Sequence, residues 1–522
     1  MKTAPDRPEL SHATKSRGLA IAIALAIGAC APIEAQPSAS PSGASPTVAT
    51  QRPSPSAASF SIAPLPGEPT VSLYLPYVTK TLGGADGLET PFIVQNADTV
   101  STDLELNFYA IADGDLVARR IVRGLKPGTS YADRPNRDGD LRDDAAYSAV
   151  VRSFGAKVVA VVNEQRGSGS HFAADSYVSQ IGGAPSVFLP SVARRVDGFV
   201  SRIVLQNVDL QPTVATAAFV LPDGTTSATL TRTVQPGRSS LIDLGAESDL
   251  RDGTRYAVRV SASARLVAIV NTQREASAQD APVLYSYGAL VDGANTVYGP
   301  YVMKNVPGVG DGTITVQNML SATTQPSLSF TPLGGGITTR FDGPSLPPGA
   351  GWSFDLRFRN GDTRQSRCGA GATTGCLADG EYSFTASASG AQLAVVVTVI
   401  GATTAAAYSA PSRPADYFLP NVTRTLGGRD GWTTPIVVQS VTASRLTLSW
   451  YRFADGVLAA TQSLTITPGS ALRVDPRNVT GLRDDAQYSV VVDGNGGRLV
   501  AVVVELNFQG GDGLAIYTGF FR

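Results

Sequence analysis

Residues 250–258 read Leu-Arg-Asp-Gly-Thr-Arg-Tyr-Ala-Val, a polar turn that runs into an apolar strand opened by Tyr256. The same step from Leu to Tyr recurs three more times, at 141–147, at 482–488 and, one residue shorter, at 377–382. Four tyrosines at one place in a recurring pattern indicate that a single unit was duplicated along the chain.

Four further signals precede each tyrosine in a constant order. An aromatic-x-Pro strand comes first, at 74–76, 188–190, 298–300 and 418–420. An Asp-Gly turn follows at 86–87, 197–198, 311–312 and 430–431. A strand then ends in a glutamine: Gln95, Gln206, Gln317 and Gln439. A Pro-Gly turn comes last, at 127–128, 236–237, 348–349 and 468–469.

The repeat has the size of a whole β-sandwich domain. Residues 76–95 and 420–439 are identical at 13 of 20 positions, and the four glutamines lie 111, 111 and 122 residues apart. A period of this length exceeds the roughly 20–50 residues of a propeller blade or a solenoid coil. We therefore expect a leader at 1–29, a tether at 30–69, and four sandwich repeats at 70–184, 185–295, 296–414 and 415–522.

Strand patterns within each copy support an all-β fold. Apolar side chains alternate at 104–108 and 446–450, as in antiparallel strands with one face on the core. Residues 157–162 and 499–504 are almost continuously apolar, which is typical of a central strand in a buried sheet. About seven or eight strands fit in each copy, and no segment has a convincing helical pattern.

Tyr147, Tyr256, Tyr382 and Tyr488 resemble the tyrosine corner of immunoglobulin-like and fibronectin type III domains, in which the hydroxyl bonds back to the main chain. The copies lack the immunoglobulin cysteine pair. The repeat order is also similar to that of bacterial Ig-like repeats of secreted and cell-surface proteins. The resemblance implies four tandem Ig-like antiparallel β-sandwiches.

The N-terminus is typical of a bacterial lipoprotein leader. Basic residues precede a 12-residue apolar run at 18–29, which is short for a membrane span of about 20 residues. The run ends in Ile-Gly-Ala-Cys at 27–30, which resembles a lipobox and implies lipidation of Cys30. A plain secretory leader with an incidental cysteine is the alternative.

Residues 36–59 are rich in Ser, Pro and Ala and contain one charge, so we expect a disordered tether of at most ~110 Å. Short connections such as 182–185 then suggest four separate beads on a rod of roughly 120–160 Å. One end of the rod would be held at a membrane through Cys30.

Copy three carries an insertion. From the Pro-Gly glycine to the tyrosine is 19 residues in the other copies and 33 in this one, from 349 to 382. Cys368 and Cys376 both lie in the extra stretch, and an even pair in an exported protein predicts a disulfide. The disulfide would either staple a flexible insertion or stiffen a recognition loop; two free thiols are the remaining alternative.

The sequence contains few residues in patterns typical of an enzyme active site. His171 is the only histidine after the leader and sits in a Gly/Ser-rich loop without a nucleophile motif, so we expect a solvated loop residue. No phosphate-binding loop, dinucleotide fingerprint or His/Cys cluster occurs. With 16% charged residues and a net charge of −1, the chain has no basic field for nucleic acid. We therefore predict a non-enzymatic protein without cofactor, catalytic residues or metal site.

Three features allow both a structural interpretation and a ligand-binding one. The acidic run Asp138–Asp144 suits a charged corner turn, with calcium binding as the alternative. The repeated glutamine suits a buried amide that satisfies loop main chain, with a row of ligand contacts as the alternative. Trp432 and Trp450 suit core positions, with a sugar-stacking platform as the alternative for Trp432.

These inferences predict an exported envelope lipoprotein, exposed at the cell surface, with an extended structural or adhesive role. Its partners would be the membrane, through Cys30, and a protein or glycan ligand. A carbohydrate- or ligand-binding module serving a partner enzyme or transporter is the second hypothesis. An unrecognised hydrolase that uses His171 is the third.

Overall fold

The structure is a computed structural model that describes residues 62–275, 282–369 and 374–522. Cys30, the leader and most of the expected tether lie outside these ranges. The described part is all-β and antiparallel, which confirms the fold class. Its only helical pieces are 3-10 turns, none of which is long enough to cross a bilayer: η1 (Pro135–Arg137), η2 (Gly169–His171), η3 (Arg359–Gly361) and η4 (Pro476–Asn478).

The strands repeat in a fixed order in each copy. Copy one contains β1 (Val71–Lys80), β2 (Phe92–Asn96), β3 (Thr102–Ala110), β4 (Leu116–Leu125), β5 (Ser130–Asp133), β6 (Ala145–Phe154), β7 (Val158–Arg166), β8 (Ala173–Val178) and β9 (Gln180–Ile181). Copy two contains β10 (Ala184–Val196), β11 (Phe199–Asn207), β12 (Thr213–Val220), β13 (Thr226–Val234), β14 (Ser239–Asp243), β15 (Thr254–Arg274) and β16 (Val283–Gly288).

Copy three contains β17 (Thr296–Lys304), β18 (Asp311–Asn318), β19 (Ser327–Pro332), β20 (Thr339–Asp342), β21 (Gly351–Asp355), β22 (Gly380–Ser387), β23 (Leu393–Ile400) and β24 (Ala405–Ser409). Copy four contains β25 (Tyr417–Arg424), β26 (Ile436–Ser440), β27 (Arg445–Arg452), β28 (Leu458–Thr465), β29 (Ala471–Val474), β30 (Ala486–Asp493), β31 (Leu499–Leu506), β32 (Leu514–Thr518) and β33 (Phe520–Phe521).

Each copy has two sheets. The A sheet contains the first strand and has the order β4-β3-β6-β1 in copy one; the B sheet has the order β5-β2-β7-β8. In copy two the long β15 belongs to both sheets and joins them. Side chains from both sheets, such as Leu106 and Ala160, meet in one core, which makes each copy a sandwich.

The strand order agrees with an immunoglobulin-like sandwich at its centre and differs at its edges. The second strand pairs with the fifth and the third with the sixth, as in the immunoglobulin fold. In that fold the first strand pairs with the second, and the sixth with the seventh. Here β1 pairs with β6, and β7 pairs with β2. The likeness therefore covers the sandwich and its central pairs.

Two tyrosines fix the main chain of each copy. The corner tyrosine Tyr147 accepts the N–H of Arg142 at 2.8 Å and donates to its carbonyl at 3.0 Å. The other three corner hydroxyls also bond to main chain four or five residues upstream, in Tyr256, Tyr382 and Tyr488. These are the contacts that a tyrosine corner makes.

The second tyrosine relieves the proline in the first strand. Pro76 has no N–H, and the ladder of β1 and β6 slips between Leu75 and Val78. Tyr177 on β8 donates its hydroxyl to the Tyr77 carbonyl at 2.6 Å, so the polar group freed by the slip stays satisfied. The other copies repeat this contact, from Tyr287, Tyr408 and Tyr517.

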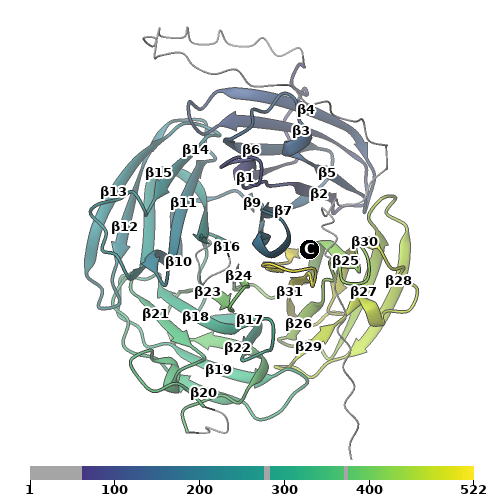
Figure 1. Cartoon of the computed structure of the whole chain (residues 1–522). Helices are drawn as coiled ribbons and strands as arrows, with labels where there is room; N and C mark the ends of the chain where they lie inside the picture. Colours follow the sequence, from purple (N-terminus) through teal and green to yellow (C-terminus); the bar gives the residue numbers. More distant parts are fainter. Residues whose placement is uncertain (1–61, 276–281, 370–373) are drawn as a thin grey trace, which may run out of the picture.

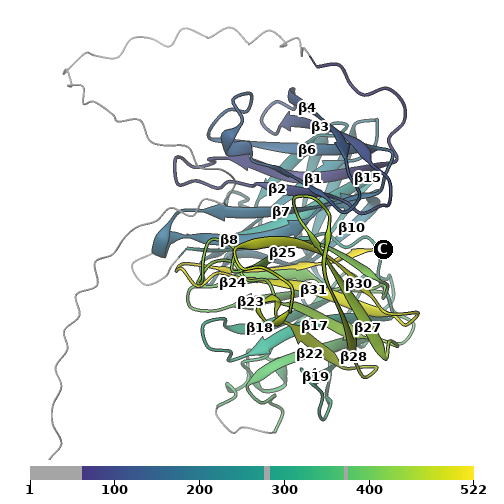
Figure 2. The ribbon, with the colours of Figure 1, turned by 90° about the vertical axis from the view of Figure 1, so that its right-hand side faces the viewer.

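The four sandwiches form a closed ring, which overturns the expected rod. In Figure 1 the sequence colours run once around the ring, and the yellow last copy lies beside the purple first copy. The A sheet of each copy packs on the B sheet of the next: β1 on β11 and β15, β10 on β18 and β23, β17 on β26 and β31, and β25 on β2 and β7. All the sheets therefore stand around one axis like the blades of a propeller, and Figure 2 shows strands running along that axis.

The ring explains the burial pattern of the B sheets. In β2, Phe92 and Val94 enter the core of copy one, whereas Ile93 between them packs with copy four. In β11, Val204 likewise joins the core of copy one. Isolated sandwiches would leave that face to water, and burying it on the neighbouring copy is more favourable than keeping a rod.

The axial strands β8, β16, β24 and β32 meet at the centre, where β32 contacts β8 and closes the circle. Asp512, which precedes β32 and is fully buried, links all four copies there. Its carboxylate accepts the N–H groups of Leu284 in copy two and Ala405 in copy three. Its own main chain bonds to Phe172 and Ala174 in copy one.

Candidate binding groove

A surface cavity with a volume of about 720 Å³ lies at the seam between copies two and three. One wall is the hairpin between β12 and β13 together with the start of β15. The other wall is β21, the loop before it, and the insertion of copy three. Gly351 in the lining lies against Ala257 of copy two, and a Cβ built on Gly224 would approach Pro347 to 2.6 Å. The two copies are thus in close contact beside the groove.

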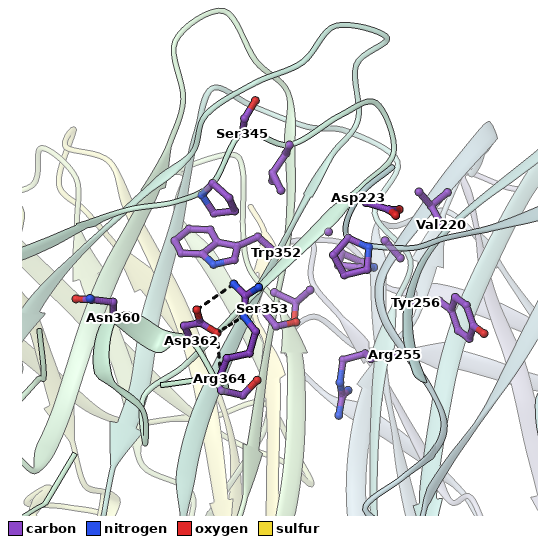
Figure 3. Close-up of a pocket in the computed structure, with 18 of the residues that line it drawn as sticks. Val220, Asp223, Arg255, Tyr256, Ser345, Trp352, Ser353, Asn360, Asp362 and Arg364 are labelled. Atoms are coloured by element: carbon purple, nitrogen blue, oxygen red, sulfur yellow. Dashed lines mark hydrogen bonds and ion pairs between the residues drawn. The ribbon is translucent and has the colours of Figure 1, made fainter. Parts of the chain in front are cut away.

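Trp352 is the aromatic side chain in the wall of copy three (Figure 3). Its indole is half-buried and stands edge-on to Phe354, with ring centroids 5.7 Å apart. Gly343 lies beneath it, since a Cβ there would come within 2.6 Å of the indole ring. The ring is therefore held rigidly while part of it stays open to the groove.

The insertion supplies an ion pair below the indole. Arg364 donates two bonds to the Asp362 carboxylate, at 2.9 and 3.0 Å, as the dashed lines of Figure 3 show. These bonds hold the pKa of Asp362 below its usual range, so it stays an anion. Because Arg364 is 88% exposed, its remaining N–H groups face solvent and are free to bond a ligand.

The opposite wall carries Asp223 at the hairpin tip and Arg255 on β15 (Figure 3). The pKa of Asp223 is lowered by the main-chain N–H of Thr225, which bonds to its carboxylate at 2.8 Å. Arg255 donates to the Ser191 hydroxyl at 2.7 Å. An aromatic face, two arginines and three aspartates (Asp223, Asp342 and Asp362) thus line one groove, a combination that suits a polar ligand with a flat apolar face.

The structure joins Cys368 and Cys376 in a disulfide with Cα atoms 5.8 Å apart. The cysteines follow the segment that lines the groove, at 360–365. Asn360 in that segment has a φ of 51° and donates its main-chain N–H to Gly375 inside the disulfide loop. The loop therefore supports one wall of the groove.

The acidic run Asp138–Asp144 lies at the corner turn among cations. Asp138 pairs with Arg120, and Asp143 lies 3.1 Å from the Lys80 ammonium. The other copies repeat the second pair as Arg194–Asp252, Lys304–Asp379 and Arg424–Asp484. Within the described ranges no three His, Cys, Asp or Glu side chains are grouped to hold a metal ion. The charged-corner interpretation accounts for these contacts.

In copies two, three and four the repeated glutamine bonds to the preceding copy. Gln317 is fully buried and donates to Val258 of copy two at 3.3 Å and to Gly349 at 3.1 Å. Gln206 reaches Ala149 of copy one, and Gln439 reaches Phe384 of copy three. The side chains satisfy main-chain carbonyls, as expected, but several of those carbonyls belong to the adjacent sandwich.

The remaining candidates lie apart from the groove. His171 is exposed at the end of η2. Trp450 is fully buried in the core of copy four. Trp432 is only half-buried and stands edge-on to Phe172 of copy one, with centroids 6.2 Å apart, so it belongs to the seam of copies four and one.

No protein-family model matches this chain, and no curated protein shows significant similarity to it. The groove itself therefore carries the functional argument. Sequence reasoning located the insertion but missed Trp352. That residue occupies the β21 position taken by Tyr131, Leu241 and Leu472 in the other copies, and comparing the copies strand by strand would have found it.

Proposed function

We propose that this chain is a non-enzymatic envelope protein that acts as an adhesive surface platform and binds a glycan in the groove between copies two and three. The observation that carries the proposal is the groove itself, in which a rigid half-open indole stands above an exposed, bidentate Arg364–Asp362 pair. Aromatic faces stack on the apolar face of a sugar ring, and forked charged groups bond to its hydroxyls.

A closed ring suits adhesion because it holds its recognition groups on a stiff frame. The groove is built from two copies that share a buried seam, so it needs little ordering when a ligand binds. Its segment 360–365 belongs to the insertion that only copy three carries. We therefore place ligand specificity in that segment and the adjoining indole.

The test is a glycan array probed with the whole chain and with Trp352→Ala. Loss of the aromatic face should weaken binding of the preferred glycan by at least tenfold. Arg364→Ala should weaken it several-fold, whereas Arg452→Ala, which removes a similar exposed Arg–Asp pair in copy four, should not. A glycan bound equally by the protein and Trp352→Ala would refute the assignment of the groove.

The second hypothesis, a binding module that serves a partner enzyme or transporter, uses the same groove for a soluble ligand. Adhesion requires that the groove also hold a polymer fixed to a surface. Binding of the protein to glycan-coated beads supports adhesion, whereas binding of free oligosaccharides alone supports the module.

Lipidation at Cys30 and exposure at the cell surface are part of the proposal and rest on the leader sequence. Cys30→Ser should release the protein from the membrane fraction or leave it unprocessed. Protease treatment of intact cells should degrade the lipidated protein if it faces outward. Unchanged membrane retention of Cys30→Ser would contradict the anchor.

A further inference from the structure

A second cavity, of about 410 Å³, lies on the ring axis and is lined by all four copies. It is formed by the last residues of β8, β16, β24 and β32 and by the turns that follow them. The residues that follow Tyr287, Tyr408 and Tyr517 are small: Gly288-Ala289, Ser409-Ala410 and Thr518-Gly519. The hydroxyls of these tyrosines bond to the first strand of their own copy, and the small residues beyond them leave room at the centre.

The polar groups of the cavity wall bond to one another across the copies. Gln180 of copy one donates to the Ala268 carbonyl of copy two at 2.7 Å. Ser409 of copy three donates to Gly288 of copy two, and Thr518 of copy four donates to Ser409 at 2.8 Å. Because these groups are already satisfied, the surface left to a ligand is mainly aliphatic and aromatic.

Large apolar side chains are exposed in this cavity. Ile181 is 50% exposed and Phe521 is 42% exposed, whereas Ile516, deeper in the lining, is fully buried. Contact with water costs free energy at these positions, and an apolar guest would remove that cost. A cavity of this volume lies within the range of small-molecule sites, which are mostly apolar with a few polar groups.

A cation belongs to the lining as well. Lys157 of copy one donates its ammonium to the Phe521 carbonyl at 2.8 Å. An ammonium has three donors, so two remain for a ligand. The other charges in the lining, Arg413 and Asp292, pair with each other at 2.7 Å.

From this arrangement we propose that the axial cavity binds a small amphiphile with an aliphatic chain and a carboxylate head. The chain lies among Ile181, Leu290 and Phe520, and the head accepts hydrogen bonds from Lys157. The cavity is surrounded by four copies, so it suits a compact guest better than an extended polymer. This site is independent of the groove between copies two and three.

Calorimetry with the full chain carrying Cys30→Ser tests the proposal, with octanoate, decanoate and dodecanoate as probes. Affinity should rise about fourfold with each buried methylene group. Decanoate should bind more tightly than decanol because only the acid pairs with Lys157. Equal affinity across the chain-length series, or no detectable binding of any acid, would overturn the proposal.

Three variants locate the site. Ala289→Phe fills the cavity and Ile181→Glu places a charge in its lining, and each should weaken decanoate binding by at least tenfold. Lys157→Gln should weaken decanoate about fivefold and leave decanol unchanged. Val100→Phe, at an exposed position outside the cavity, is the control for an added aromatic side chain.

Ile181→Glu changes an exposed side chain, so it reports on the site even if Ala289→Phe fails to fold. Decanoate affinity within twofold of the parent in Ile181→Glu would rule out this cavity. Trp352→Ala should leave decanoate binding intact, which separates this proposal from that of the glycan groove.

Discussion

The seam between copies two and three and the seam between copies four and one share one backbone design but differ at the axis. At one position of the B sheet, copies one and four have the buried carboxylates Glu164 and Glu505, where copies two and three have Thr272 and Val399. The seam of copies two and three joins consecutive parts of the chain. The seam of copies four and one joins its two ends without a covalent link.

The unlinked seam of copies four and one is polar, and so is the seam of copies one and two. Glu505 of copy four accepts the Ser176 hydroxyl of copy one at 2.6 Å, and Asn421 bonds its other oxygen at 2.7 Å. Glu164 accepts both Asn271 and Ser286 of copy two. Buried carboxylates are costly, but each is satisfied in only one arrangement of neighbours. We infer that this cluster selects the closed ring over other ways of covering the B sheets.

The largest effect of a single substitution should follow from Asp512→Ala, which leaves the N–H groups of Leu284 and Ala405 buried without acceptors. The loss should be about 4 kcal/mol in the free energy of unfolding, measured with urea. Thr403→Ala, at the corresponding exposed position of copy three, should change stability by less than about 0.5 kcal/mol. A loss below about 1 kcal/mol for Asp512→Ala would mean that the axis does not depend on it.

A pH dependence should distinguish the two seams of copy one from the seam of copies two and three. Burial raises the pKa of Glu164 and of Glu505 to about 7, and it raises the pKa values of Asp175 and Asp512 well above the usual range. The folded protein thus binds more protons than the unfolded chain between about pH 4.5 and 7. Stability should be greatest below the ordinary Glu pKa and should fall as the pH rises through 7, by about 3 kcal/mol for each glutamate.

Urea unfolding between pH 5 and 8 measures this slope. Glu164→Gln combined with Glu505→Gln should flatten it, because two of the titrating groups are gone. Carboxylates paired with Arg or Lys, such as Asp379 and Asp484, have lowered pKa values and act only in the acid range below about pH 4. If stability depends on pH as steeply in the double variant as in the parent, groups other than these two glutamates cause the pH dependence.

Removal of a glutamine contact should have a smaller effect at the chain-linked seam. Gln317→Ala leaves the Val258 and Gly349 carbonyls without their buried donor, which should cost about 2 kcal/mol of unfolding free energy. Gln211→Ala, at an exposed loop position, is the matched control and should be neutral. If both variants unfold at the same urea concentration as the parent, the glutamine row does not hold the copies together.

The smallest effect on stability should come from Cys368→Ser with Cys376→Ser. The loop closed by the disulfide spans a sequence separation of only 8, and the insertion can unfold separately from the sandwich, so its loss should cost less than about 2 kcal/mol. Glycan binding in the groove should nevertheless fall, because the loop supports the 360–365 segment. Calorimetric unfolding together with glycan binding compares the two outcomes; intact glycan binding would show that the loop only staples the insertion.

Local features of the fold could be predicted from the sequence because their causes are local. The Leu-to-Tyr spacing fixes a tyrosine corner within about six residues, and Pro-Gly supplies a turn in each copy. The Asp-Gly turn expected at 311–312 is wrong, because Asp311 begins β18. The insertion was located by counting residues between repeated signals. These features depend on residues that are close in the chain.

The ring was missed because burial patterns report which residues are covered and not what covers them. The continuous apolar run at 158–162 meant that both faces of its sheet are buried, and the second face is covered by copy four. Gln206 looked like a residue that satisfies its own loop, yet one of its acceptors lies in copy one, 57 residues away. The apolar run and the repeated glutamine are both visible in the sequence. Only the arrangement of the copies around an axis shows which neighbouring copy each one contacts.

Small-angle X-ray scattering of the chain from residue 62 onward tests the closed ring most directly. A compact body of this length should have a radius of gyration of about 23 Å, with a single-peaked distance distribution. Four beads on a rod of roughly 120–160 Å would give a radius of gyration of roughly 40 Å and a long tail in that distribution. The first result is the one expected here, and the second would show that copies one and four do not meet.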